Sequence, residues 1–383
     1  MKVNVVSFSS SGGAGNVSMA LAEGFLSLGF LTKLQIATHT NLRSNPLLYP
    51  KHTMYAAVDN FVAKRKDWSS LISLSRDKLS IPFDAQGADL NVFRWMNGML
   101  GESMSQRSIA IPNLVWGLDD MNPFTGVCHY SGACRGFECS CEGCPALRGF
   151  ANHKAQIHLQ EKIQFARAYS PRYVAPTEWM HSEFRKSALS REASSHKIWN
   201  PIRSKFFEAH ESKSEGRNML RVLVIAQNLD DEVKGVWDVH SVLLRLQGNP
   251  RVRLTLVGRF SNQLAAALPK ATFLGPVSSA VVLEQLNDND VLLVPSLFEN
   301  AGTVIAEAAS QGLPSIARRV GGLPEMTNYG RTGVLFSHSD ELLDIIESLT
   351  KNDLKTLGDA AKEWSMKLQP HIIAKRYAEV FLK

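Results

Sequence analysis

Short runs of hydrophobic residues alternate with longer segments of helical periodicity in the first half of the chain. Residues 3–8 form a hydrophobic run that leads into a turn of serine and glycine at residues 9–15. Between residues 17 and 28, apolar side chains recur at spacings of three and one, which is typical of one buried helix face. The pattern predicts a strand, a glycine-rich turn and a helix. Further segments with the length of buried parallel strands occupy residues 31–37, 90–95, 109–116, 173–176 and 197–199.

The same alternation restarts after residue 200, where Asn200-Pro201 interrupts the pattern and a charged stretch follows at residues 208–217. The predicted strands of this second half are residues 220–226, 253–257, 271–274, 291–294 and 315–317. The predicted helices are residues 236–246, 280–286, 304–311 and the segment beyond residue 339. Alternating strands and helices predict an α/β protein with parallel sheets. We therefore expect two such domains, divided near residue 200, with a ligand cleft between them.

Composition narrows the class of protein. The chain has 383 residues, of which 44% are hydrophobic and 20% are charged, so it has the length of two or three ordinary domains. No run of 18 apolar residues occurs, and the first residues have the pattern of a strand rather than of a secretory signal, so we expect a cytoplasmic protein. The net charge of +6 suits phosphate-bearing ligands or an anionic membrane surface and is too small to indicate nucleic acid.

Two glutamates eight positions apart, Glu299 and Glu307, flank the junction between a predicted buried strand and a predicted helix. The backbone N–H groups of residues 302–304 begin that helix and form an anion site. Carboxylates beside an anion site suit a ligand that has both hydroxyls and phosphate, such as a nucleotide sugar. The alternative is an ordinary helix start whose acidic residues complement the helix dipole.

This segment resembles the E-x7-E signature of family 4 glycosyltransferases, which are retaining enzymes of the GT-B fold. Four further matches follow the family's order: Gly12-Gly13-Ala14-Gly15, Lys234-Gly235, Gly312-Leu313-Pro314 with residues 320–325, and residues 330–333. The resemblance implies two Rossmann-like domains whose parallel sheets face a cleft. It assigns acceptor binding to residues 1–199, nucleotide-sugar binding to residues 200–368, and a helix that crosses back to the first domain to residues 369–383.

The resemblance also implies roles for individual residues. Glu307 would bind the ribose hydroxyls, Glu299 the hydroxyls of the donor sugar, and Lys234 would neutralise the diphosphate leaving group without a catalytic metal. The loop at Gly12 and Gly13 would let the backbone approach the diphosphate closely. The remaining donor-binding candidates are Arg259, Leu274, Gly275, Asn300, Gly302, Thr303 and Val304. For Leu274 and Gly275, a buried strand end followed by a turn is an equally good interpretation.

The chain departs from the family pattern at charged positions. Many relatives have an arginine before the lysine, where this chain has uncharged residues 226–229, and Arg259 is a candidate substitute. The nearest subgroup, bacterial polysaccharide enzymes with a cysteine-rich loop, has histidines in place of Arg94 and Asp119. We hypothesise that these two residues form an ion pair instead, the alternative being two solvated loop charges. Asp119 is a third catalytic candidate beside Glu299 and Lys234, and Arg94, Asp120 and His129 are candidates for the acceptor side of the cleft.

All five cysteines lie between residues 128 and 144. Four of them, Cys128, Cys134, Cys141 and Cys144, have the spacing C-x5-C-x6-C-x2-C, which predicts a closed tetrahedral zinc site and leaves Cys139 over. Disulfides, free thiols and an iron–sulfur cluster are the alternatives. A closed zinc site would hold residues 120–148 over the acceptor side of the cleft. His129 is an alternative ligand.

Taken with the resemblance, these features predict a retaining hexosyltransferase. The donor would be a UDP- or GDP-sugar, and the acceptor a saccharide, lipid-linked, in bacterial surface-polysaccharide synthesis at the cytoplasmic membrane face. We expect a structural zinc ion and no nucleic-acid partner. The alternatives are a catalytically weak nucleotide-sugar-binding subunit and a GT-B sugar-nucleotide epimerase, against which the E-x7-E segment argues.

Overall fold

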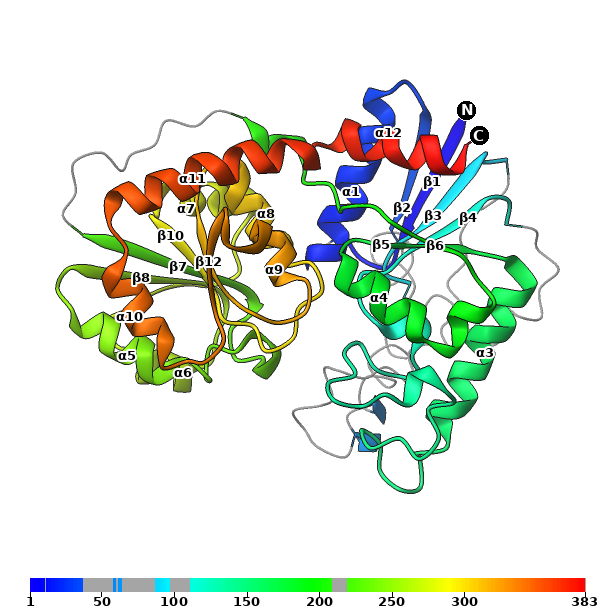
Figure 1. The fold of residues 1–383 in the computed structure, drawn as a ribbon, viewed down its shortest axis with the longest axis horizontal. Coiled ribbons are helices and arrows are strands. Elements are labelled where there is room, and N and C mark those ends of the chain that lie inside the picture. The colour runs from blue at the N-terminus through cyan, green and yellow to red at the C-terminus, as the bar shows by residue number, and fades with distance from the viewer. Residues whose placement is uncertain are drawn as a thin grey trace, which may run out of the picture. The chain divides into compact units, whose positions relative to one another are not determined.

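The chain folds into two compact units, shown in Figure 1. Unit 1 contains residues 1–203 and 370–383, and unit 2 contains residues 204–369. The first unit therefore ends at residue 203 rather than at the expected 199, and the chain returns to it at residue 370 rather than 369. The computed structural model describes residues 1–10, 12–36, 58–59, 61–63, 87–96, 111–208 and 219–382.

The described part of unit 1 contains a six-stranded parallel sheet in the order β2-β1-β3-β4-β5-β6. The strand order reverses between β1 and β3, and ligands of α/β sheets bind at the carboxyl ends of the strands beside such a switch point. The strands are β1 (Lys2–Ser7), β2 (Leu31–Ile36), β3 (Leu90–Phe93), β4 (Leu114–Gly117), β5 (Arg172–Ala175) and β6 (Ser195–Lys197).

Helices cover both faces of this sheet because successive strand residues point to opposite sides. Val6 belongs to the core that the sheet forms with α3 (Lys154–Tyr169) and α4 (Glu178–Lys186). The neighbouring Val5 belongs to the opposite core, formed with α1 (Gly12–Ser27) and α12 (Pro370–Phe381). Each face of the sheet is therefore buried under a pair of helices.

The last helix packs directly on the first, as Figure 1 shows. A Cβ atom at Gly24 of α1 would lie 2.1 Å from the carbonyl oxygen of Pro370 and 2.9 Å from Cβ of Ala374. Phe25, the next residue, makes an edge-to-face contact with Tyr377 of α12. The two helices approach this closely only because residue 24 is a glycine. The C-terminal helix is thus part of the core of unit 1.

The described residues of unit 2 form a second six-stranded parallel sheet, in the order β12-β11-β10-β7-β8-β9. Its order reverses between β10 and β7, which is the Rossmann arrangement. The strands are β7 (Leu220–Asn228), β8 (Val252–Arg259), β9 (Thr272–Leu274), β10 (Val291–Val294), β11 (Ser315–Arg318) and β12 (Gly333–Phe336). The helices are α5 (His240–Gly248), α6 (Asn262–Ala267), α7 (Ser279–Asp288), α8 (Thr303–Ser310), α9 (Leu323–Met326), α10 (Glu341–Ser348) and α11 (Lys351–Ser365). The prediction of two α/β halves with parallel sheets is confirmed.

Several predicted boundaries are wrong in detail. The helix predicted from residue 236 begins at His240, because residues 236–239 form a turn after the left-handed Gly235. The short elements α6 and β12 were not predicted, because a segment of six or four residues is too short to show a periodicity. Residues 109–110 of a predicted strand and residues 209–217 of the charged stretch lie outside the described residues.

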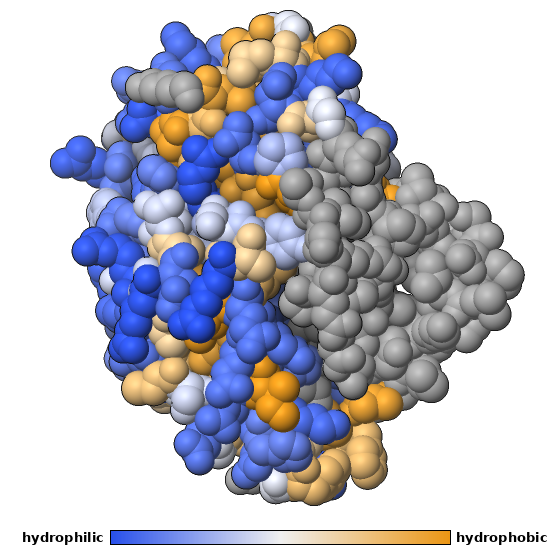
Figure 2. Space-filling view, turned by 90° about the vertical axis from the view of Figure 1, so that its right-hand side faces the viewer, coloured by the Kyte–Doolittle hydropathy of each residue, from blue (hydrophilic) through white to orange (hydrophobic). Residues whose placement is uncertain are grey.

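The surface follows the pattern of an ordinary globular protein. In the coloured part of Figure 2, hydrophilic side chains cover most of the face, and hydrophobic residues form small separate groups among them. No described helix combines the length and the apolar composition that a bilayer crossing requires.

Replacing Gly24 by alanine tests the contact between α1 and α12. We expect the free energy of unfolding to fall by about 1–3 kcal/mol, because the added Cβ overpacks a backbone contact. Urea denaturation followed by circular dichroism measures the change. Gly248→Ala, at the end of α5, is the control, because an added Cβ there has nothing within 4 Å and stability should be unchanged or higher. Equal stability of Gly24→Ala and the parent protein would contradict the close packing.

Candidate functional site

In unit 2 a lysine and a glutamate meet at the carboxyl ends of two neighbouring strands. Lys234 ends the 3₁₀ turn Glu232–Lys234 after β7, and Glu299 lies in the loop between β10 and α8. Lys234 Nζ donates a hydrogen bond to Glu299 Oε2 at 2.8 Å. The side chains are 29% and 15% exposed, so the pair is accessible to a ligand. Because β7 and β10 flank the switch point, the sheet order brings both charges to the edge where such folds bind ligands.

The environment keeps Lys234 charged. Burial acts to lower the pKa of Lys234, but the carboxylate of Glu299 and, next, that of Asp231 act in the opposite direction. The net effect raises the pKa of Lys234 above its usual value. Lys234 is therefore a cation at neutral pH and can serve as an electrostatic partner for a phosphate.

Backbone contacts fix the loop that carries Glu299. Gly235 adopts a left-handed φ of 68°, and a Cβ there would lie 2.1 Å from the carbonyl oxygen of Pro295. The N–H of Leu297 donates to the Val233 carbonyl at 2.8 Å. The Lys234-Gly235 motif thus supplies both the cation and the close backbone contact that positions its carboxylate partner.

The E-x7-E segment surrounds the start of α8. Gly302, the N-cap residue, is in a left-handed conformation and has no side chain to cap the first turn, which begins with Thr303 and Val304. The first N–H groups of a helix have no acceptor within it, so this turn presents donors to an anion. Glu307 lies in the second turn and is 8% exposed, while Asn300 is 2% exposed. The segment thus presents one accessible carboxylate, Glu299, and one that is largely buried.

The other predicted donor residues end neighbouring strands. Arg259 is the exposed last residue of β8, and Leu274 is the half-buried last residue of β9, with Gly275 directly after it. All three lie on the same sheet edge as Lys234, since the strands are parallel. Their donor-binding role, and the substitution of Arg259 for the absent arginine, stay predictions.

Arg318, the last residue of β11, was not among the predicted site residues. Its side chain is 7% exposed, and its Nε donates to the carbonyl oxygen of Pro295 at 3.0 Å. The guanidinium also forms an ion pair with Asp238 and donates to the Ser337 carbonyl at 3.3 Å. Arg318 therefore anchors the start of the loop that carries Glu299. An arginine at the end of an otherwise apolar strand was the signal that could have revealed it.

In unit 1 the predicted ion pair between Arg94 and Asp119 is confirmed. The side chains are 1% and 9% exposed, so the alternative of two solvated loop charges is wrong. Arg94 Nη2 also donates to Asn200 Oδ1 at 2.9 Å, and Nη1 donates to the hydroxyl of Tyr377 at 3.4 Å. One guanidinium therefore joins the segments after β3, β4 and β6 to helix α12.

Burial opposes both charges of this pair, and their mutual attraction favours them. Burial raises the pKa of Asp119 to about 6, although Arg94 acts in the opposite direction. For Arg94, burial acts to lower the pKa, but Asp119 and Tyr377 together hold it above its usual value. Both groups are predominantly charged at neutral pH. The pair is built into the core of unit 1, and a catalytic role of Asp119 stays a prediction.

Asp120 and His129, both predicted as acceptor-side residues, form a second buried pair. His129 Nδ1 lies 2.6 Å from Asp120 Oδ2, and the residues are 7% and 8% exposed. The same oxygen accepts from Trp95 Nε1 at 3.2 Å, and Asp120 Oδ1 accepts from the N–H of Asn122 at 2.8 Å. A carboxylate held in this way orients the imidazole, and such a pair can hold or pass on a proton.

The glycine loop and Trp95 lie at the switch point of unit 1. Gly12 and Gly13 begin α1, which follows β1, and Trp95 lies just after β3. The N–H of Phe8 donates to the Trp95 carbonyl at 2.9 Å, and the two aromatic rings are in edge-to-face contact. Phe8, which follows β1, and the Asp120–His129 pair are therefore linked through Trp95.

The cysteine-rich loop brings four sulfurs to one place. Cys128, Cys134, Cys141 and Cys144 line a common cavity, whereas Cys139 is exposed. A hydrogen bond with Cys128 lowers the pKa of Cys144 to about 7 and raises that of Cys128. Among the described residues, no three His, Cys, Asp or Glu side chains already have metal-ligating geometry. The zinc site stays a prediction.

Comparison with known proteins finds a match to the second unit. Residues 220–352 match the family model described as "Glycosyl transferases group 1". Most of unit 2 is therefore similar to group 1 glycosyltransferases. The matched residues include Lys234, Glu299 and Glu307 together with the start of α8.

The chain is similar in sequence to individual proteins over part of its length. It is similar in fold to solved structures over its whole length. The chain is 34% identical over 97 residues to an "Uncharacterized 41.2 kDa protein in cps region" of Klebsiella pneumoniae. The aligned residues cover 24% of this chain and 27% of that relative. The chain therefore matches about a quarter of that relative's length. The structure is similar to sucrose-phosphate synthase of Thermosynechococcus elongatus, with a TM-score of 0.70, 17% identity, and coverage of 100% of this chain and 98% of that one. For HepE of Anabaena in complex with UDP-glucose, the TM-score is 0.64 at 17% identity, with 99% of both chains covered. The GT-B fold is confirmed.

Removal of the Asp119 carboxylate tests the buried ion pair. Asp119→Asn leaves the guanidinium of Arg94 without its counter-charge, so we expect the free energy of unfolding to fall by about 3–5 kcal/mol. The double variant Arg94→Met/Asp119→Asn removes both charges and should lose much less than the sum of the losses of Arg94→Met and Asp119→Asn alone. Chemical denaturation of the four proteins measures this cycle. Additive losses, or a loss below about 1 kcal/mol for Asp119→Asn, would contradict a coupled buried pair.

Proposed function

We propose that the chain is a retaining glycosyltransferase that moves a hexose from a nucleotide-diphosphate sugar to a saccharide acceptor. The observation that carries this proposal is the contact of Lys234 with Glu299 beside the first turn of α8, inside the segment that matches the group 1 glycosyltransferase model. A cation, a carboxylate and free helix-start donors together complement the phosphates and hydroxyls of such a donor. The solved complex of HepE with UDP-glucose makes a UDP-sugar the first donor to test.

In this proposal the donor is held by unit 2. Lys234 faces the diphosphate, and the N–H groups of Thr303 and Val304 add positive potential to it. Glu299 accepts hydrogen bonds from the sugar hydroxyls, and Glu307 accepts those of the ribose. When the donor binds, Lys234 and Glu299 exchange part of their mutual contact for contacts with phosphate and sugar.

The transfer step breaks the bond between the anomeric carbon and the diphosphate oxygen. The acceptor oxygen forms its bond on the same face, so the anomeric configuration is retained, and the acceptor proton passes to the leaving diphosphate or to solvent. Lys234 and the helix-start amides stabilise the negative charge that develops on the leaving group, a role that requires no metal ion. The Asp120–His129 pair of unit 1 is our candidate for holding the acceptor hydroxyl.

We further propose that the acceptor is a lipid-linked saccharide of a bacterial surface polysaccharide. The resemblance to enzymes of that pathway supports this acceptor, as does the similarity to a Klebsiella pneumoniae protein from a cps region. The net charge of +6 is compatible with transient contact with an anionic membrane surface that carries such an acceptor.

Replacement of Lys234 or Glu299 tests the donor site. Lys234→Ala removes a charge-assisted contact with the diphosphate, so we expect the affinity for UDP and UDP-glucose to fall about 10- to 100-fold. Glu299→Gln keeps the shape of the side chain but removes its charge, and we expect donor turnover to fall at least 100-fold. Calorimetric titration measures binding, and release of the nucleoside diphosphate measures turnover, with UDP-, GDP- and ADP-sugars tested in turn.

Exposed residues of the same unit provide matched controls. Lys355→Ala on α11 and Glu347→Gln on α10 change the same groups away from the switch point and should behave as the parent protein does. Donor binding without turnover would favour a nucleotide-sugar-binding subunit, and conversion of the donor sugar without an acceptor would favour an epimerase. If Lys234→Ala and Lys355→Ala bind nucleotide equally well, the site assignment is wrong.

A further inference from the structure

Four of the five cysteines surround one small cavity in the segment between β4 and α3. These cavity cysteines are Cys128, Cys134, Cys141 and Cys144, and the cavity has a volume of about 20 Å³. About 10–15 Å³ is enough for one water-sized particle, so the cavity has room for a single ion. Cys139 does not line the cavity and is exposed. The fold thus separates four sulfurs from the fifth.

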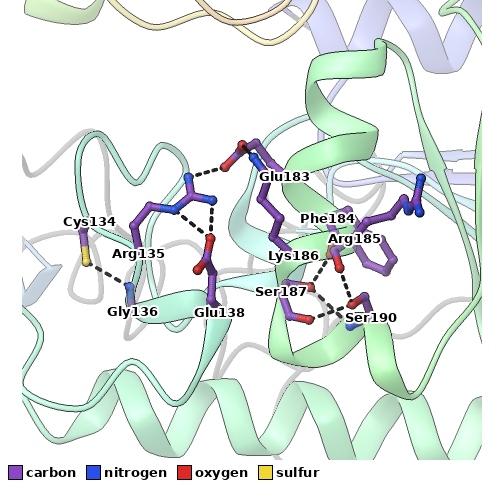
Figure 3. Close-up of polar contacts among 10 residues, drawn as sticks. All are labelled: Cys134, Arg135, Gly136, Glu138, Glu183, Phe184, Arg185, Lys186, Ser187 and Ser190. Carbon is purple, nitrogen blue, oxygen red and sulfur yellow. Dashed lines mark hydrogen bonds and ion pairs between the residues drawn. The ribbon is translucent and has the colours of Figure 1, made fainter.

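Backbone N–H groups point at two of these sulfurs. Gly136 donates to Cys134 Sγ at 3.4 Å, as Figure 3 shows, and Gly126 donates to Cys141 Sγ at 3.3 Å. A neutral thiol is a weak acceptor, whereas a metal-bound thiolate gains from such donors, which orient it and stabilise its charge.

A tight turn presents the C-x2-C pair to the cavity. Cys141 has a φ of 54° and Gly143 a φ of 63°, so the chain reverses within the two residues that separate Cys141 from Cys144. A left-handed conformation is uncommon for a residue with a side chain. Cys144 lines the same cavity as Cys128, which lies on another part of the loop. The turn therefore gathers sulfurs from distant positions in the sequence.

Cations hold the loop around the cavity. Lys162 of α3 donates through Nζ to the carbonyl oxygens of Asn122 at 2.7 Å, Thr125 at 3.0 Å and Gly126 at 3.4 Å. The positive charge of Lys162 also acts on Cys141. A site of four thiolates and one divalent ion has a net charge of about −2, which a nearby ammonium group partly compensates.

A second link ties the loop to α4. Arg135, next to Cys134, donates through Nη1 to Glu183 Oε2 at 2.6 Å and through Nε to Glu138 Oε1 at 2.8 Å, as Figure 3 shows. Lys186 donates to the other oxygen of Glu183 at 2.8 Å. The cysteine loop is therefore held on one side by the hydrogen bonds of Lys162 and on the other by the ion pair of Arg135 with Glu183, and its folded path does not depend on the cysteines alone.

We propose that the four cavity cysteines are the ligands of a structural Zn²⁺ ion. Because no three described His, Cys, Asp or Glu side chains already have ligating geometry, the sulfurs must draw inward to the Zn–S distance of about 2.3 Å. Four Zn–S bonds form, and the four thiol protons pass to solvent. A closed site has no open position for substrate. Its effect is positional: Cys128 adjoins His129, so the ion fixes the Asp120–His129 pair.

Metal analysis of the full chain tests this site. Protein purified without chelators should contain about one equivalent of zinc by mass spectrometry of the elements. Cys134→Ser and Cys144→Ser should each lose most of it. Cys139→Ser, the matched control, should keep it. Less than about half an equivalent in the parent protein, or equal zinc in Cys134→Ser and Cys139→Ser, would overturn the proposal.

Three further measurements keep the test decisive if a serine variant fails to fold. Exchange of the metal for Co²⁺ in the parent protein should give the intense visible bands of tetrahedral thiolate coordination, and their absence would contradict a four-sulfur site. Chelation should lower the melting temperature reversibly, because the ion binds the folded state. A mass about 2 Da below that of the reduced chain, lost on addition of a reductant, would show a disulfide between cavity cysteines and would also overturn the zinc assignment.

Discussion

The contact between Lys234 and Glu299 is the interaction on which the functional interpretation of this protein depends. Neither residue belongs to a strand, yet the order β10-β7 in the sheet places the turn after one strand beside the loop after the other. Gly235 and Arg318 then hold the start of that loop through the carbonyl of Pro295. The start of α8 follows directly, so a cation, a carboxylate and helix-start donors share one sheet edge.

Unit 1 uses a buried charge for a different purpose. The guanidinium of Arg94 binds Asp119, Asn200 and Tyr377, which lie on three separate parts of the chain. Burial of such a network costs free energy, because its charged groups lose their hydration. The stability of unit 1 is therefore sensitive to the loss of any partner in the network. It also attaches α12 to the segments that follow β3 and β4, close to Trp95 and the Asp120–His129 pair. The residues proposed to face the acceptor thus lie next to a buried network that holds separate parts of the chain together.

Much of the fold could be predicted from the sequence because buried parallel strands are short, apolar and bounded by turn residues. The strand at residues 291–294 has the predicted bounds, and the helix at Thr303–Ser310 differs by one residue. The ion pair of Arg94 with Asp119 was predicted from paired departures from a family pattern. Three features were not predicted: the contact of Lys234 with Glu299, the role of Arg318, and the pairing of Asp120 with His129. Each joins residues whose proximity depends on strand order or loop path, which hydrophobic periodicity does not encode.

The stereochemistry of donor cleavage tests the proposed chemistry most directly. Proton NMR can follow UDP-glucose, or the nucleotide sugar that binds best, in the presence of the chain and with water as the acceptor. A retaining enzyme releases the nucleoside diphosphate together with the sugar anomer of the donor, before that anomer equilibrates in solution, and Glu299→Gln should abolish the release. First appearance of the opposite anomer, or no release from any nucleotide sugar that binds, would contradict a retaining transferase built on Lys234 and Glu299.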